Sequence, residues 1–324
     1  EAHPFPPEII ERIISSLFTT KSTFSTAESV FRVSHQFRTI ALRIYFRRVV
    51  LPSRTGATRI LQTPRVSEWL RRVIIFAHIL STSVSLRSLG LLGVEIDFSL
   101  ETLGVQSFNI QDTGANLPAG LETLRLARLP YITASMLRSV ASHCPSLKDL
   151  ELGVMERLDT TCCWTCLADS EACVAHSPVG RHGQDFDSLV TSFSQALQPL
   201  QHLRQLSLGI FLSHSTLVPV HLDLHGPSRA LAIVGTPSGD NSSAPQTPSS
   251  GCCAICIRQY SAQVRRNELL ASVRLAQHLP KVESLRWGSW FTGHRVNGSE
   301  GAEVLWTTFG ATREMGRVKV RRIR

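Results

Sequence analysis

One short pattern recurs along most of this 324-residue chain: an apolar residue, two variable positions, a second apolar residue, one variable position and a third apolar residue. The alternation at its end is typical of a strand with one buried face. Seven copies occur, at Leu70/Val73/Ile75, Leu86/Leu89/Leu91, Leu100/Leu103/Val105, Leu121/Leu124/Leu126, Leu147/Leu150/Leu152, Leu203/Leu206/Leu208 and Val282/Leu285/Trp287. Since a single such strand cannot bury its own apolar face, the copies are predicted to stack as neighbouring strands.

Three copies follow a helical pattern that stops at a proline. Helical periodicity runs through 132–143 before Pro145, through 189–197 before Pro199, and through 269–279 before Pro280. Because the residue before a proline is pushed out of the α region, each helix is predicted to end there and a strand to follow. These units resemble leucine-rich repeats, which implies an α/β fold: an irregular solenoid with parallel strands.

The intervals between copies are uneven. The first two are 16 and 14 residues, shorter than the usual repeat, whereas Leu121 to Leu147 is 26 residues, which fits. Some early copies are therefore either bare strands or chance matches. The repeat-like domain is predicted over 52–312, with insertions at about 153–187 and 209–263. A βα sheet without solenoid curvature is the alternative.

The end of the chain is basic. Segments 306–309 and 318–320 are predicted to pair as a hairpin around Glu314-Met315-Gly316, which would close the end of the array. Residues 313–324 form a basic strand or tail, and the net charge of the chain is +9. This balance favours acidic partners, including nucleic acid. Without interleaved aromatic and basic residues, a solvated basic tail is the preferred interpretation and nucleic acid the alternative.

Residues 1–51 are predicted to form a module of three short helices and an exit strand. Pro7 suits a first helical position, and apolar residues follow in two adjacent stripes. Ser25 and Glu28 form a capping box that opens a second helix through Val30 and Val33. A third helix follows Ser34, and 47–51 is extended. The stripes and the third helix contain Ile9, Ile13, Leu17, Ile10, Ile14, Phe18, Phe37, Ile40, Ala41, Ile44 and Tyr45. Helices this short cannot bury so much apolar surface among themselves, so a docking module is predicted; capping of the downstream core is the alternative.

The module resembles the F-box. Its motifs are Phe5-Pro6-Pro7-Glu8-Ile9, then Ile13 and Leu17, then Val33-Ser34-His35-Gln36-Phe37, then Tyr45-Phe46. Phe5 departs from the usual Leu, and Ser34 and Phe37 depart from the usual Cys and Trp. The resemblance implies docking on a Skp-type adaptor of a cullin ubiquitin ligase, through Phe5, Pro6, Pro7, Ile9, Ile10, Ile13, Leu17, Val33, Phe37 and Phe46. The segment from Cys253 to Phe291 is also similar to the C-terminal part of fungal F-box proteins.

Seven of the eight cysteines fall in two clusters, each containing the pattern C-C-x-x-C. A C-x-x-C pair offers two thiolates from one tight turn, as a tetrahedral metal requires. If 147–152 and 203–208 are adjacent parallel strands, both clusters would emerge at one edge of the sheet. A structural zinc site would use Cys163, Cys166, Cys253 and Cys256, with His221 or His225 as alternates. Reduced loops without metal are the equal alternative.

The sequence contains no phosphate-binding glycine loop, nucleophile elbow or metalloprotease motif, so a non-catalytic adaptor is predicted. The longest apolar stretch, 73–80, is interrupted by His78 and is too short to cross a bilayer, and no signal peptide is recognisable. A cytoplasmic or nuclear adaptor that binds an unidentified target protein is therefore expected.

Overall fold

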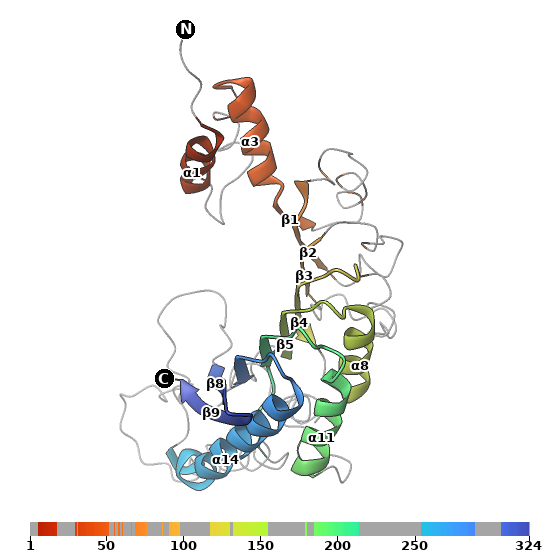
Figure 1. The fold of residues 1–324 in the computed structure, drawn as a ribbon, viewed down its shortest axis with the longest axis vertical. Helices are drawn as coiled ribbons and strands as arrows, with labels where there is room; N and C mark the ends of the chain where they lie inside the picture. The colour runs from red at the N-terminus through yellow and green to blue at the C-terminus, as the bar shows by residue number, and fades with distance from the viewer. Residues whose placement is uncertain are drawn as a thin grey trace, which may run out of the picture. The chain divides into compact units, whose positions relative to one another are not determined.

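The computed structural model describes residues 6–17, 30, 32–51, 69–76, 91–97, 117–129, 132–154, 185–213, 254–288 and 306–323, with single residues at 55, 58, 60, 66, 86 and 179. This described part is mixed α/β, with five helices and nine strands (Figure 1). The helices are α1 (Pro7–Leu17), α3 (His35–Tyr45), α8 (Ala134–His143), α11 (Phe186–Leu197) and α14 (Ala254–His278).

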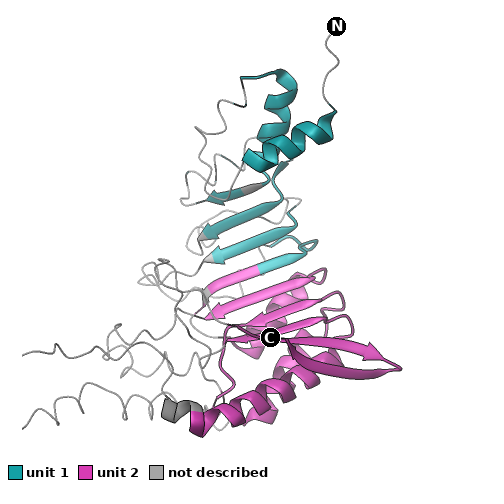
Figure 2. Ribbon diagram, turned by 90° about the vertical axis from the view of Figure 1, so that its left-hand side faces the viewer, with its two compact units in different colours: residues 1–124 teal, residues 125–324 magenta. Residues whose placement is uncertain are grey.

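The nine strands hydrogen-bond in their order along the chain. They are β1 (Arg48–Leu51), β2 (Arg72–Phe76), β3 (Gly93–Asp97), β4 (Thr123–Leu129), β5 (Asp149–Val154), β6 (Gln205–Leu208), β7 (Ser284–Gly288), β8 (Trp306–Glu314) and β9 (Arg317–Ile323). The pairs β1–β2, β2–β3, β5–β6 and β6–β7 are parallel, whereas β7–β8 and β8–β9 are antiparallel. The chain divides into two compact units, 1–124 and 125–324, so that the boundary falls within β4 (Figure 2).

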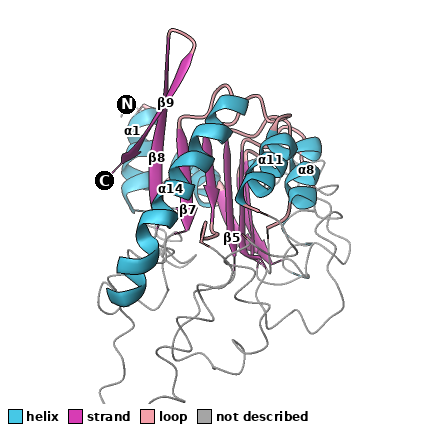
Figure 3. Ribbon diagram, turned by 90° about the horizontal axis from the view of Figure 1, so that it is seen from below, coloured by secondary structure: helices cyan, strands magenta, loops and turns pink. Residues whose placement is uncertain are grey.

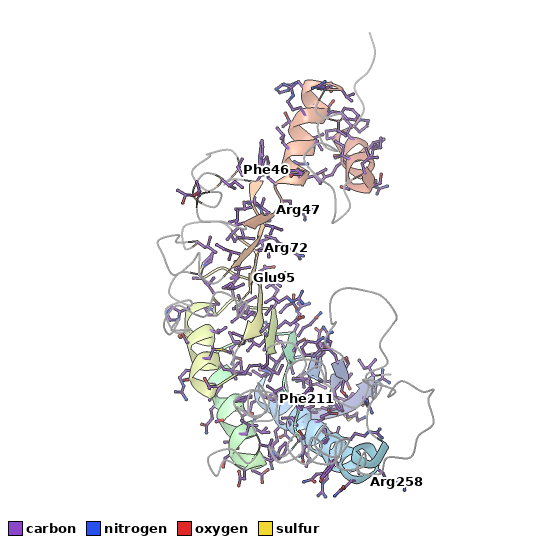
Figure 4. The ribbon with its side chains drawn as sticks, turned by 180° about the vertical axis from the view of Figure 1, so that it is seen from behind. Phe46, Arg47, Arg72, Glu95, Phe211 and Arg258 are labelled. Atoms are coloured by element: carbon purple, nitrogen blue, oxygen red, sulfur yellow. The ribbon has the colours of Figure 1, made fainter. Side chains whose placement is uncertain are left out.

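Successive parallel strands begin with the same pair of hydrogen bonds. The carbonyl of Arg47 accepts from the N–H groups of Arg71, at 3.1 Å, and Arg72, at 2.8 Å. The carbonyls of Arg71, Leu92, Lys148 and Arg204 each accept two consecutive N–H groups in the same way. Figure 4 shows Arg47, Arg72 and Glu95 following one another along the first strands. The strands therefore enter the sheet at equivalent points.

Most of the predicted strand pattern is confirmed. The copies at 70–75, 121–126, 147–152, 203–208 and 282–287 coincide with β2, β4, β5, β6 and β7, and their apolar residues are buried. The copy at 86–91 was placed too early. The strand is β3, and the buried residues Leu91, just before it, and Val94 and Ile96, within it, repeat the pattern five residues later. The apolar pattern fits both at 86–91 and at 91–96. The β-branched residues Val94 and Ile96 favour a strand at the later position. The copy at 100–105 lies outside the described residues.

In the second unit, α8, α11 and α14 precede β5, β6 and β7 and lie side by side on one face of the sheet (Figure 3). The three predicted helix-strand units are confirmed. Thr133 and Asp185 cap α8 and α11 by accepting from the backbone N–H groups of Met136 and Ser188. Helix α14 begins at Ala254, within the span of about 209–263 where an insertion was predicted.

A C-terminal hairpin forms around the predicted turn, but the predicted pairing of 306–309 with 318–320 was wrong. Residues 318–320 pair with 311–313, and Thr308 and Phe309 pair with Ile323 and Arg322. Strand β8 pairs with β7 and β9, and the connection contains Met315 at φ 49° and Gly316 at φ 76°. Two consecutive positive φ angles give a turn whose twist matches the strands it joins. From β8, the guanidinium of Arg313 donates to the carbonyls of Ala276 at 2.8 Å and Leu279 at 2.5 Å, and thereby caps the end of α14.

Candidate partner-docking site

Helix α1 begins where the sequence predicts. Pro7 occupies its first position, where a missing N–H costs nothing, and the Pro6 carbonyl accepts from Ile9 at 3.0 Å and Ile10 at 3.3 Å. Glu8 lies in the first turn, where its charge complements the helix dipole. These local interactions define where α1 begins, and its packing against α3 determines which of its isoleucines are buried.

Helix α3 has defined caps at both ends. The Ser34 hydroxyl accepts from the N–H of Phe37 at 3.2 Å, and the N–H of Phe46 donates to the Leu42 carbonyl at 2.9 Å. The Tyr45 and Phe46 rings meet edge to face, with centroids 5.3 Å apart. The cap at Ser34 places Val33 in a turn just before the helix, so the prediction that Val33 belongs to a helix was wrong.

One stripe of α1 packs against α3. Ile10 and Ile14 are buried together with Val30, Ile40 and Ala41, and partly buried side chains surround this cluster: Phe37, Leu42, Ile44 and Tyr45. At the surface, Arg43 of α3 makes an ion pair with Glu11 of α1 at 2.8 Å. The predicted core face of α3 is thus confirmed, and the helix pair has a small core of its own.

The adjacent stripe of α1 is exposed. Ile9 and Ile13 are each 45% exposed and Leu17 is 50% exposed, while Val33 is 63% exposed. The three side chains of α1 lie one turn apart along the helix, so they form a continuous apolar strip. Large apolar residues gathered on one helix face are typical of a surface that another protein covers.

The predicted docking residues therefore divide into groups. Pro6, Pro7, Ile9, Ile13, Leu17 and Val33 are exposed, whereas Phe37 and Phe46 are half-buried. Ile10 was wrong as a docking residue, because its position in α1 directs it into the chain's own core, where it is 1% exposed. Phe5 lies outside the described residues, as do Phe18, Ser25 and Glu28.

The predicted zinc site lies largely outside the described residues, which exclude Cys163, Cys166, His221, His225 and Cys253. The backbone of Cys256 lies in the first turn of α14, not in the tight turn that the sequence suggested. Within the described ranges no three His, Cys, Asp or Glu side chains come together as metal ligands. Burial raises the pKa of Cys144, the cysteine outside both clusters, to about 12, so its thiol stays protonated.

A polar surface on the sheet was missed from the sequence. The Glu151 carboxylate of β5 lies 3.0 Å from Arg125 Nε of β4 and 3.9 Å from Arg286 Nη1 of β7. The Arg286 guanidinium also lies over the ring of Trp306, 4.7 Å from its centroid. The sequence pattern could have revealed this surface. The variable position between the last two apolar residues of the pattern is occupied by Arg125, Glu151 and Arg286 in three of the copies.

No known family model and no curated protein sequence matches this chain. Among the described residues, no helix is both long enough and apolar enough to span a membrane.

Proposed function

We propose that this chain is the substrate-recognition adaptor of a Skp-cullin-F-box ubiquitin ligase. Helices α1 and α3 form the module that docks on a Skp-type adaptor, and the strands with their helices form an irregular leucine-rich-repeat array that holds the target protein. The chain itself carries out no catalysis. It acts in the cytoplasm or the nucleus by bringing the target to the ligase.

The observation that supports docking is the division of α1 into two apolar stripes. Ile10 and Ile14 supply the contact with α3, whereas Ile9, Ile13 and Leu17 lie outside that buried cluster and remain about half exposed. Burying each half-exposed side chain in a partner would contribute about 1 kcal/mol, or about 3 kcal/mol for the stripe. An apolar stripe with four-residue spacing is also what a helix needs to dock in a groove.

The repeat array is supported by the regularity of the strand entries. Carbonyls that each accept two consecutive N–H groups recur from Arg47 to Arg204, and α8, α11 and α14 cover one face of the sheet in the second unit. A unit that repeats both its strand and its covering helix is typical of leucine-rich repeats. In the part of the second unit that the structure describes, these helices lie on that one face, and the other face is the one proposed to hold the target.

The docking proposal is tested by co-expressing the chain with a Skp-type adaptor and measuring the complex by size-exclusion chromatography. The double variant Ile13→Asp/Leu17→Asp should lose the complex, because two carboxylates would be buried in an apolar contact. Leu92→Asp is the matched control: Leu92 is 46% exposed and lies outside α1 and α3. Equal binding by the wild type and the double variant, or no binding by the wild type, would refute the proposal.

A further inference from the structure

The sheet face that points away from α14 carries most of the charge of the C-terminal hairpin. Cross-strand partners in antiparallel pairs share a face, and the register pairs Gly310 with Arg321, Thr312 with Lys319, and Glu314 with Arg317. The same register places Arg286 beside Thr308. The alternate residues on these strands include buried Leu285, Trp287, Phe309 and Ala311, which pack on the helix side. The charged side chains therefore lie on the open face.

This open face is basic. Among the described residues of β7, β8 and β9 it holds four cations, Arg286, Arg317, Lys319 and Arg321, and one carboxylate, that of Glu314. Lys319 makes an ion pair with Glu314. The three basic residues of β9 are exposed and alternate along the strand, so successive charges are about 7 Å apart.

The side chain of Arg286, at one side of this face, is restrained by its neighbours. Its guanidinium lies between the Glu151 carboxylate and the Trp306 ring, and its side chain is 33% exposed. A guanidinium fixed in this way loses less conformational freedom when it binds a ligand than a solvated one does. Arg and Trp are also the residues most often found at the centres of protein interfaces.

We propose that this open face binds an extended acidic segment of a target protein. In an extended peptide, every second side chain points the same way and successive ones are about 7 Å apart, which matches the spacing of Arg317, Lys319 and Arg321. Ion pairs with Glu151 and Glu314 interrupt the positive charge of the surface, so a peptide whose carboxylates are separated fits it better than a continuous phosphate backbone does. This inference deepens the proposed function, since it names the chemistry of the target.

The test uses the full chain and a fluorescent peptide in which Glu alternates with Thr or Val. Its affinity is measured by fluorescence anisotropy beside that of a peptide with Lys in place of Glu and that of a single-stranded oligonucleotide of similar length. The acidic peptide should bind the wild type most tightly. Arg317→Glu/Arg321→Glu should weaken this binding by about tenfold or more, because two attractions become repulsions.

The matched control is Arg258→Glu/Arg266→Glu, which makes the same change of net charge at two exposed positions of α14; Figure 4 marks Arg258. Circular dichroism melting establishes that both double variants are folded. The proposal is overturned if the wild type does not bind the acidic peptide, if the control loses as much affinity as the β9 variant, or if the oligonucleotide binds more tightly and is lost with the same substitutions.

Adaptor binding is measured on the same preparations, and none of these substitutions lies in α1 or α3. Retained adaptor binding without peptide binding would overturn only the acidic-segment surface. Peptide binding without adaptor binding would overturn only the docking proposal.

Discussion

The indole Nε1 of Trp287 on β7 donates a hydrogen bond of 2.9 Å to the hydroxyl of Ser272 on α14, and both residues are buried. The same hydroxyl donates to the Glu268 carbonyl one turn earlier at 2.7 Å. A small polar side chain thus satisfies the indole N–H inside an otherwise apolar contact between helix and sheet. This bond ties α14 to the last parallel strand.

Replacing Ser272 with Ala should leave the Trp287 N–H buried without an acceptor. The expected loss in the free energy of unfolding is about 1–3 kcal/mol, measured by urea denaturation. Ser142→Ala is the control, because the Ser142 hydroxyl is exposed and donates to a carbonyl of its own helix. It should change the free energy by less than about 0.5 kcal/mol. Equal effects of the two substitutions would contradict the role given to Ser272.

Stability should depend on pH through Glu268, whose side chain is 3% exposed on α14. Burial raises its pKa from 4.5 to about 7, although Arg322, Arg265 and a hydrogen bond from Thr307 act in the opposite direction. Since the folded pKa exceeds the unfolded one, the stabilising contribution is fully present below pH 4.5 and is lost as the pH rises through about 7.

Glu268→Gln should therefore make the chain more stable than the wild type at about pH 8, by up to about 3 kcal/mol, and should remove this part of the pH dependence. Urea denaturation across the pH range measures both effects. Glu283→Gln removes the same charge at an exposed position and should leave the wild-type profile unchanged. If the free energy of unfolding of Glu268→Gln depended on pH as strongly as that of the wild type, a group other than Glu268 would be responsible for the pH dependence.

The close stacking of strand ends should make Gly209 costly to replace. A Cβ on Gly209 would lie 3.0 Å from the Cα of Gly153 and 3.1 Å from the Leu152 carbonyl oxygen, both of them backbone atoms. Gly209→Ala should cost about 1–3 kcal/mol, because the strands must move apart. At Gly120 a Cβ meets nothing within 4 Å, so Gly120→Ala should change thermal stability little or raise it slightly. Similar melting temperatures for the two variants would argue against this packing constraint.

The two stripes of α1 should respond differently to truncation. Ile14 is fully buried, so Ile14→Ala should destabilise the helix pair by about 2–5 kcal/mol. Ile13→Ala removes a similar side chain that is half exposed, and should cost less than about 0.5 kcal/mol in the absence of a partner. The effect of each substitution is measured by hydrogen exchange of the α3 amides. If Ile13→Ala lost as much protection as Ile14→Ala, the exposed stripe of α1 would be stabilising the helix pair itself.

The strands that the sequence predicted best are those whose apolar positions match in one register only. Leu150 and Leu152, or Leu206 and Leu208, alternate with polar or small residues, so the side that faces the helices is unambiguous. Around Leu86 to Ile96 apolar residues are dense enough to fit twice, and local pattern alone placed the strand too early. Choosing between registers requires the neighbouring strands, which the sequence does not order.

Which isoleucines of α1 would be exposed could not be predicted. Ile9, Ile10, Ile13 and Ile14 are equivalent in hydrophobicity, and the difference between them arises from the angle at which α3 packs on α1. The early start of α14 was missed for a related reason. Its first turn, Ala254 to Ile257, is apolar, whereas most residues from Arg258 to Asn267 are polar, so the helical periodicity across this part is weak.

The paired N–H bonds at each strand entry have a consequence for how this chain can vary. Because every such strand is fastened to its predecessor by the same carbonyl geometry, the polypeptide that joins two strands need only return to that point. Connections as different as the short one between Leu51 and Arg72 and the far longer one between Leu208 and Ser284 lead into the same junction. The sheet should thus tolerate changes of connection length. A proline at a position whose N–H donates at a junction, such as Arg72 or Thr123, would remove one of the paired bonds and should be costly.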